Sequence, residues 1–233
     1  MSQFSVIIPA AGSSTRFEGF QQKKPFVDLQ GRPVWLRTVD HFVNRNDVAE
    51  VVLVLAESDI ESFRERFRAD LMLLDLQIVK GGTTRAHSVL NGLNALTKPS
   101  DYVAVHDAAR PLLTKKWITE LFAAASEKQA VIPGTAVSST VKKTDASGAI
   151  VQTVDRSQLF LAQTPQVFRR TLLQEAYAAA QDYASFTDEA SIVEAYDHPV
   201  HVHPGWPMNI KITTREDFHL AEVLLPALPA DDE

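Results

Sequence analysis

The chain has 233 residues, 45% of them hydrophobic, which is enough for one good-sized core. A formal net charge of −6 argues against a nucleic-acid-binding protein, and the lack of cysteine excludes disulfides, thiolate metal sites and cysteine nucleophiles. No apolar run reaches the ~18 residues of a membrane helix, and the first strand begins at once, so we expect no targeting segment. We therefore expect a single domain over residues 1–233, soluble and cytoplasmic, with no nucleic-acid or membrane partner.

The first predicted element is a buried strand that leads into a loop of small residues. Phe4–Ile8 is apolar and β-branched, and Pro9 ends the strand because proline cannot donate to a sheet ladder. Ala10-Ala11-Gly12 carry almost no side chain, so a ligand can approach their backbone N–H groups closely. Such a turn is also common as a purely structural feature, but Arg16 and Lys23-Lys24 add cations beside it. Together these features favour a polyphosphate site, although neither standard phosphate-binding fingerprint is present.

Strands and helices then alternate. Apolar runs predict strands at 51–55, 76–79, 102–105 and 130–133. Periodic apolar positions predict helices that begin at Pro33, at a Ser58–Glu61 capping box, at Thr83 or Thr84, and at Thr114. This rhythm predicts an α/β fold, with a Rossmann-like, mostly parallel sheet, helices on both faces, and ligands at the carboxyl ends of the strands.

The rhythm breaks near residue 136. Residues 139–144 and 149–154 alternate around Asp145-x-x-Gly148, which predicts a β-hairpin. A hairpin with few apolar residues that projects from a compact domain needs a surface to pack on. We therefore interpret residues 136–158 as a dimerisation arm and predict a homodimer.

The C-terminal part returns to helices and extended segments. We predict helices at 170–182 and 187–196, an extended piece at 198–205, a short strand at 209–212, and a last helix capped by Thr214 and Asp217.

Asp107 is the strongest candidate for metal chemistry. It follows the strand at 102–105, where a carboxylate can hold a hard divalent cation against phosphate oxygens. An aspartate in this place is also common as a turn or helix-cap residue. Arg110 either pairs with Asp107 or reaches an anionic substrate; both interpretations fit the sequence.

Several short motifs occur in order over nearly the whole chain. They are Pro9-Ala10-Ala11-Gly12-x3-Arg16, Lys24, Gly81-Gly82-x2-Arg85-x2-Ser88, His106-Asp107-Ala108-Ala109-Arg110-Pro111, Thr140, Val154-Asp155-Arg156, Thr164-Pro165-Gln166, Thr187-Asp188-Glu189-Ala190 and Asn209-Ile210-Lys211. With these motifs the chain resembles the 2-C-methyl-D-erythritol 4-phosphate cytidylyltransferase family, within the sugar-phosphate nucleotidyltransferases. The opening loop alone indicates only the wider group.

The resemblance implies a reaction. A phosphate oxygen of 2-C-methyl-D-erythritol 4-phosphate attacks the α-phosphorus of CTP, with Mg²⁺, and gives 4-diphosphocytidyl-2-C-methyl-D-erythritol and pyrophosphate in non-mevalonate isoprenoid biosynthesis. The implied roles are catalysis by Arg16, Lys24 and Lys211; nucleotide binding by Ala10, Ala11, Gly12, Gly82 and Ser88; substrate binding by Arg110, Thr140, Arg156, Thr164 and Lys211; and metal binding by Asp107. Thr140 and Arg156 would come from the partner's arm.

Two residues depart from the family pattern. Met208 stands where a second acidic metal ligand is usual, and Thr83 stands where an acidic residue near the base is frequent. A thioether is a poor ligand for Mg²⁺. Two alternatives stay open: a ribitol-5-phosphate cytidylyltransferase, which has the same fold and chemistry on a different polyol phosphate, and a nucleotide-binding protein that has lost catalysis, for which Met208 is the argument.

Overall fold

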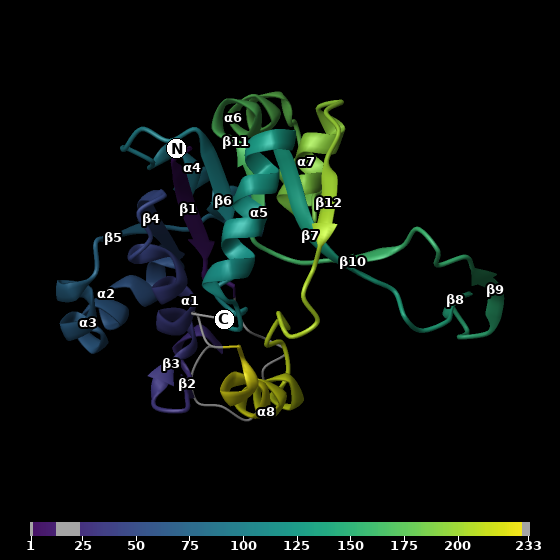
Figure 1. Ribbon diagram of the computed structural model, residues 1–233, viewed down its shortest axis with the longest axis horizontal. Helices are drawn as coiled ribbons and strands as arrows, with labels where there is room; N and C mark the ends of the chain where they lie inside the picture. The colour runs from purple at the N-terminus through teal and green to yellow at the C-terminus, as the bar shows by residue number, and fades with distance from the viewer. Residues whose placement is uncertain (1, 13–23, 230–233) are drawn as a thin grey trace.

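The computed structural model describes residues 2–12 and 24–229, and its centre is an eight-stranded sheet (Figure 1). Along the sheet the order is β10-β7-β11-β6-β1-β4-β5, and β12 pairs with β7. The strands are β1 (Phe4–Pro9), β4 (Val48–Leu55), β5 (Leu76–Lys80), β6 (Tyr102–Val105), β7 (Ala130–Ala136), β10 (Phe160–Ala162), β11 (Gln166–Arg169) and β12 (His201–Pro204).

Strands β6, β1, β4 and β5 are adjacent and parallel, so their carboxyl ends meet at one edge. Alternate residues of β1 enter different cores: Val6 and Ile8 pack on one side of the sheet and Ile7 on the other, all without exposed surface. A strand buried on both faces needs a continuous apolar sequence, which is what this segment has. The predicted α/β fold with a mostly parallel sheet is confirmed.

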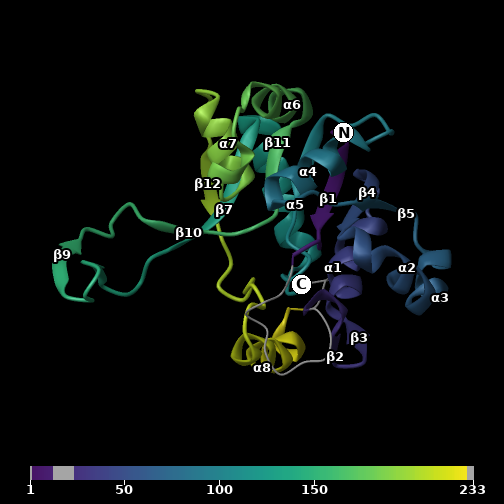
Figure 2. The ribbon, with the colours of Figure 1, turned by 180° about the vertical axis from the view of Figure 1, so that it is seen from behind.

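Helices cover both faces (Figures 1 and 2). They are α1 (Val34–Val43), α2 (Glu57–Arg66), α3 (Arg68–Leu73), α4 (Arg85–Asn94), α5 (Lys115–Lys128), α6 (Arg170–Ala179), α7 (Glu189–Ala195) and α8 (Arg215–Leu224), with short 3₁₀ turns η1 (Lys24–Phe26), η2 (Tyr183–Ser185) and η3 (Leu225–Ala227). Helices α1, α2 and α5 supply apolar side chains to one core, and α4, α6 and α7 to the other. A smaller cluster lies between α8 and the β2–β3 pair (Asp28–Leu29 and Arg32–Pro33).

Strand β11 is an element that the sequence did not predict. It has four residues, runs antiparallel between β6 and β7, and is buried except at its last residue. The run is too short to give a strand signal. The side chain of Gln166 is buried here, donates to Asp188 Oδ2 at 2.8 Å and accepts from the backbone N–H of Ala190 at 3.0 Å. This polar residue therefore ties the sheet to the start of α7.

The predicted hairpin is confirmed as an arm that extends away from the body of the protein (Figures 1 and 2). It contains β8 (Val141–Thr144) and β9 (Ile150–Val154), which among the described residues form a two-stranded antiparallel sheet of their own. Gly148 has a φ of +87° and closes the turn by donating its backbone N–H to the carbonyl of Asp145. The positive φ explains why glycine stands at this position.

Two local predictions are wrong. Helix α2 begins at Glu57 with Ala56 as its N-cap, so Ser58 lies inside the first turn and cannot cap it; its hydroxyl donates to Asp59 instead. Residues 209–212 form no strand, and in the described part of the chain they are held by single backbone bonds such as that from Ile212 N to the carbonyl of Ala109. The caps predicted at Thr84, Thr114 and Thr214 are confirmed. Among the described residues, no helix is long and apolar enough to cross a membrane.

Candidate functional site

The loops that follow β1, β4 and β5 meet at the carboxyl edge of the sheet. Backbone bonds from Ala10 N to Val54 O and from Gly81 N to Leu55 O fix the starts of two of these loops. A Cβ added at Gly81 would lie 2.7 Å from the Cβ of Ala11 and 3.0 Å from Ser88 Oγ. Only glycine therefore allows this close approach of the two loops.

The first turn of α4 lies beside this contact. Thr84 caps the helix by accepting from the backbone N–H of His87, and Ser88 Oγ accepts from the backbone N–H of Gly82 at 3.1 Å. We call Ala10, Ala11, Gly81, Gly82 and Ser88 the small-residue corner; it contains four of the five residues predicted to bind the nucleotide. The fifth, Gly12, follows Ala11, and a Cβ there would meet nothing within 4 Å.

Asp107 lies on the neighbouring strand end, surrounded by cations. Lys211 Nζ is 2.7 Å from Asp107 Oδ2, Arg85 NH2 is 3.3 Å from Oδ1, and Arg110 Nε is 3.7 Å from Oδ2. Burial raises the pKa of Asp107, but Arg85, Lys211 and Arg110 together outweigh it and hold this pKa well below its ordinary value. The carboxylate is therefore ionised at neutral pH. We call Arg85, Asp107, Arg110 and Lys211 the Asp107 cluster.

A buried hydrogen-bond network holds the cluster from behind. Thr164 Oγ1 accepts from the backbone N–H of Asp107 at 3.1 Å and lies 3.0 Å from His106 Nδ1, while His106 Nε2 lies 2.9 Å from the carbonyl of Arg110. Burial lowers the pKa of His106 to about 3, so the ring is neutral. A neutral ring that donates from Nε2 to the carbonyl must accept the hydroxyl proton of Thr164 at Nδ1.

Asn209 extends this network to the segment that carries Lys211. The side-chain amide of Asn209 donates to the backbone carbonyl of Thr164 at 2.8 Å. The backbone carbonyl of Asn209 accepts from Arg110 NH1 at 2.7 Å. The sequence left open whether Arg110 pairs with Asp107 or reaches a substrate. In the structure it contacts Asp107 and Asn209 together, with little exposed surface.

Sequence reasoning assigned no role to Arg85 or Glu189, which the structure joins to the site. Arg85 NH1 donates to both carboxylate oxygens of Glu189, at 2.7 and 2.9 Å, and the Tyr177 hydroxyl donates to Glu189 Oε1 at 3.3 Å. The pKa of Glu189 is raised by burial, against the opposing charge of Arg85. The signal available in the sequence was that both residues stand in the motifs of the family resemblance, Gly81-Gly82-x2-Arg85-x2-Ser88 and Thr187-Asp188-Glu189-Ala190.

The remaining predicted site residues are not brought to this cluster. Thr140 and Arg156 lie on the exposed arm, just before β8 and just after β9, away from the body (Figure 1). Arg16 and Lys23 lie outside the described residues, as does the side chain of Lys24.

The donor set around Asp107 suits a hard cation only in part. Within residues 2–12 and 24–229 there is no group of three or more His, Cys, Asp or Glu side chains arranged to hold a metal ion. An ionised carboxylate is nevertheless the ligand that Mg²⁺ prefers, and this ion often takes one or two carboxylates and completes its shell with substrate phosphates and water. The residues therefore fit Mg²⁺ if bound phosphates supply the other ligands.

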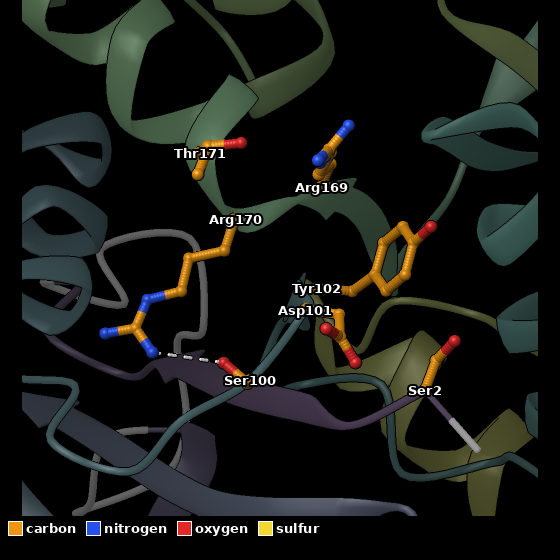
Figure 3. Close-up of a pocket in the computed structure, with 7 residues that line it drawn as sticks. All are labelled: Ser2, Ser100, Asp101, Tyr102, Arg169, Arg170 and Thr171. Carbon is orange, nitrogen blue, oxygen red and sulfur yellow. Dashed lines mark hydrogen bonds between the residues drawn. The ribbon is translucent and has the colours of Figure 1, made fainter.

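A hollow of about 540 Å³ lies at the opposite, amino edge of the sheet (Figure 3). Of the two arginines that line it, Arg170 donates to Ser100 Oγ, drawn as the dashed line, and to the carbonyls of Leu96 and Lys98. Arg170 therefore ties the start of α6 to the segment between α4 and β6, and the hollow is separate from the Asp107 cluster.

A parallel α/β sheet whose carboxyl edge joins a small-residue corner, a helix N-terminus and cations around one carboxylate defines a nucleotide-binding class of protein that handles phosphorylated ligands. A family model for 2-C-methyl-D-erythritol 4-phosphate cytidylyltransferase matches residues 4–227. The chain belongs to this family and is a nucleotidyltransferase of isoprenoid biosynthesis.

Individual relatives agree with the family model. A protein with the family's name from Symbiobacterium thermophilum is 43% identical over 222 residues, which cover 95% of this chain and 92% of that one. The one from Rhodopirellula baltica is 38% identical over 232 residues, or 95% and 94% of the two chains. The crystal structure of 4-diphosphocytidyl-2C-methyl-D-erythritol synthase from Anaerococcus prevotii superposes with a TM-score of 0.80 at 30% identity and covers 97% of this chain and 99% of that one.

Proposed function

We propose that residues 1–233 act as one unit that joins CTP to 2-C-methyl-D-erythritol 4-phosphate at the carboxyl edge of the sheet. A phosphate oxygen of the alcohol phosphate attacks the α-phosphorus of CTP in line, a new O–P bond forms, and the bond to the β-phosphate breaks to release pyrophosphate. No covalent intermediate on the protein is needed. The observation that carries this proposal is the Asp107 cluster, in which three cations surround one carboxylate beside the small-residue corner.

The roles follow from charge and access. The small-residue corner lets the nucleoside approach backbone donors, and Ala10, Ala11, Gly12, Gly82 and Ser88 surround it. Lys211, whose side chain is 41% exposed, is the most accessible cation of the Asp107 cluster and stabilises the phosphate as charge develops. Arg110 and Thr164 bind the alcohol phosphate, and Arg16 and Lys24 bring further charge to the α-phosphate.

Mg²⁺ is part of the proposal. Asp107 would hold it through a carboxylate oxygen, with phosphates as the remaining ligands, and the ion would neutralise phosphate charge. Lys211 donates to Asp107 Oδ2 at 2.7 Å, so the lysine must give way at that oxygen or the ion must take the other one. Met208 is half-buried and supplies no oxygen ligand from its side chain.

We also propose a cytoplasmic homodimer in which the arm of one chain completes the site of the other. Large apolar side chains on the arm and at its base are unusually exposed: Ile150 is 65%, Val151 63%, Phe160 49% and Leu161 61% exposed. Such a patch favours a protein interface. Because Thr140 and Arg156 lie on the same arm, docking it on a second copy would supply these two residues to that copy's phosphate substrate.

The shared site has a direct test by complementation. Arg156→Ala and Lys211→Ala are each expected to lose most activity. If the arm acts across the dimer, mixing the two proteins under conditions that exchange subunits creates heterodimers with one intact site and restores activity. A mixture that stays inactive although heterodimers form would refute the exchange of arms.

The substrate is tested by pyrophosphate release from CTP and Mg²⁺ with 2-C-methyl-D-erythritol 4-phosphate and, in parallel, ribitol 5-phosphate. We expect release with the first. Release of pyrophosphate with ribitol 5-phosphate alone would show that the protein is a ribitol-5-phosphate cytidylyltransferase. Release with neither substrate, while CTP still binds, would show that the protein has lost catalysis. In the same assay Lys24→Ala should keep the fold and lose most of the rate, and near-normal turnover would overturn its role.

A further inference from the structure

We propose that Arg85 and Glu189 are a positioning pair for Asp107: Glu189 holds Arg85 so that Asp107 presents one oxygen to the ligand side and stays available to a divalent cation. This inference rests on the proposed function, because it assumes that Asp107 holds the cation of the nucleotide. The two residues lie 104 positions apart in the sequence and meet where α4 and α7 both begin.

The contacts of Arg85 are divided between the two carboxylates. Its NH1 is bound by both oxygens of Glu189, whereas its Nε and NH2 face Asp107 Oδ1 at the longer distances of 3.4 and 3.3 Å. Asp107 Oδ2 is left to Lys211 and Arg110. The guanidinium therefore fixes the orientation of the Asp107 carboxylate from one side and leaves the other oxygen facing the partly exposed ammonium group of Lys211.

Burial explains why this arrangement depends on Glu189. The Glu189 side chain has no exposed surface, and Arg85 is only 29% exposed. A carboxylate in such a place is retained only with a charged partner, and its other hydrogen bond comes from Tyr177. Arg85, Arg110 and Lys211 carry one positive charge more than Asp107 and Glu189 together, and without the charge of Glu189 the excess would rise to two. Arg85 would move closer to Asp107, and a cation there would be repelled.

The test is the gain in CTP affinity that Mg²⁺ produces, measured by calorimetry without the alcohol phosphate, so that no reaction occurs. Glu189→Gln is expected to reduce this gain by roughly 10–100-fold, the usual effect of losing a partner that orients a metal ligand. Tyr177→Phe removes one hydrogen bond to Glu189 and should reduce the gain in the same direction by a smaller factor. This milder variant keeps the test decisive if Glu189→Gln does not fold.

Glu50→Gln is the matched control. Glu50 is also a buried carboxylate, but it lies at the amino end of β4, where it accepts from Ser5 Oγ and from the backbone N–H groups of Thr97 and Lys98. Its loss should lower the free energy of unfolding and leave the Mg²⁺-dependent gain unchanged. A merely structural role for Glu189 would give the same result in both variants.

A double mutant shows whether Glu189 acts through Asp107. In an Asp107→Asn background, Glu189→Gln should cause no further loss of the gain, because its target is gone. Two results overturn this inference and leave the proposed metal role standing. One is a loss from Glu189→Gln that is as large in the Asp107→Asn background as in the wild type, and the other is an unchanged Mg²⁺-dependent gain in a folded Glu189→Gln protein. A wild-type protein without any Mg²⁺-dependent gain contradicts the proposed metal role and this inference with it.

Discussion

The buried ring of His106 predicts a specific dependence of stability on pH. The residue has no exposed surface and lies between the hydroxyl of Thr164 and the carbonyl of Arg110. Burial lowers its pKa to about 3 in the folded protein, against about 6.5 when unfolded. Between these two pKa values, the unfolded chain binds a proton at His106 that the folded protein does not bind. The free energy of unfolding therefore falls as the pH drops below the pKa of the unfolded state.

The size of the effect follows from the difference between the two pKa values. Each pH unit between them costs about 1.4 kcal/mol. Acidification from about pH 7.5 to about pH 4.5 therefore removes roughly 3 kcal/mol of the free energy of unfolding through His106. His106→Gln cannot titrate but keeps an amide in the same space. The variant is expected to be less stable than wild type at neutral pH, and this gap should narrow by roughly 3 kcal/mol at about pH 4.5.

Urea unfolding of both proteins at several pH values, without added metal, measures this gap. Other carboxylates, Asp107 included, titrate in both proteins, so their contributions largely cancel in the difference. A gap that stays constant between neutral pH and about pH 4.5 would show that His106 is not kept neutral by burial. It would also refute the assignment of the Thr164 hydroxyl as a donor to its Nδ1.

Three further substitutions have expected outcomes. Lys211→Ala should lower kcat by about 10²–10³-fold, because an exposed cation at the reacting phosphate is lost. Its free energy of unfolding should change by less than about 1 kcal/mol. A kcat equal to that of the wild type in a steady-state assay would contradict the role of Lys211. Ile150→Asp on the arm should produce monomers in light scattering at micromolar concentration, whereas Leu73→Asp, on α3 and 88% exposed, should leave the dimer intact. Gly81→Ala should cost about 1–3 kcal/mol and raise KM for CTP, since the new methyl group overlaps the Cβ of Ala11; an unchanged melting temperature and KM would show that the loop moves freely.

Much of the fold was predictable because its signals are local. The continuous apolar runs of β1 and β6 predict buried strands, and Thr84, Thr114 and Thr214 cap helices through bonds to residues three positions ahead. The arm was visible as an alternating, polar segment with a glycine turn. The predicted cap at Ser58 was wrong because a capping sequence does not fix which residue is the N-cap of the helix. In the structure the N-cap is Ala56.

The site was predictable only as a set of loops at one edge of the sheet. Strand ends placed Ala10, Gly82 and Asp107 near one another, but no spacing in the sequence pairs Asp107 with Lys211, or Arg85 with Glu189. Much of this arrangement depends on strand β11. Its four residues lie between β6 and β7, and they connect Thr164, which contacts Asp107, to α6 and then α7.

Most helices and strands could be predicted from the sequence, because hydrophobic periodicity and caps act between residues a few positions apart, whereas the short strand β11 could not. The electrostatics of the site could not be predicted, because they depend on contacts between distant parts of the chain. The ionised state of Asp107 depends on Arg110 nearby and on Arg85 and Lys211 from two distant parts of the sequence, and their effect exists only once folding has excluded water and brought them within a few ångströms.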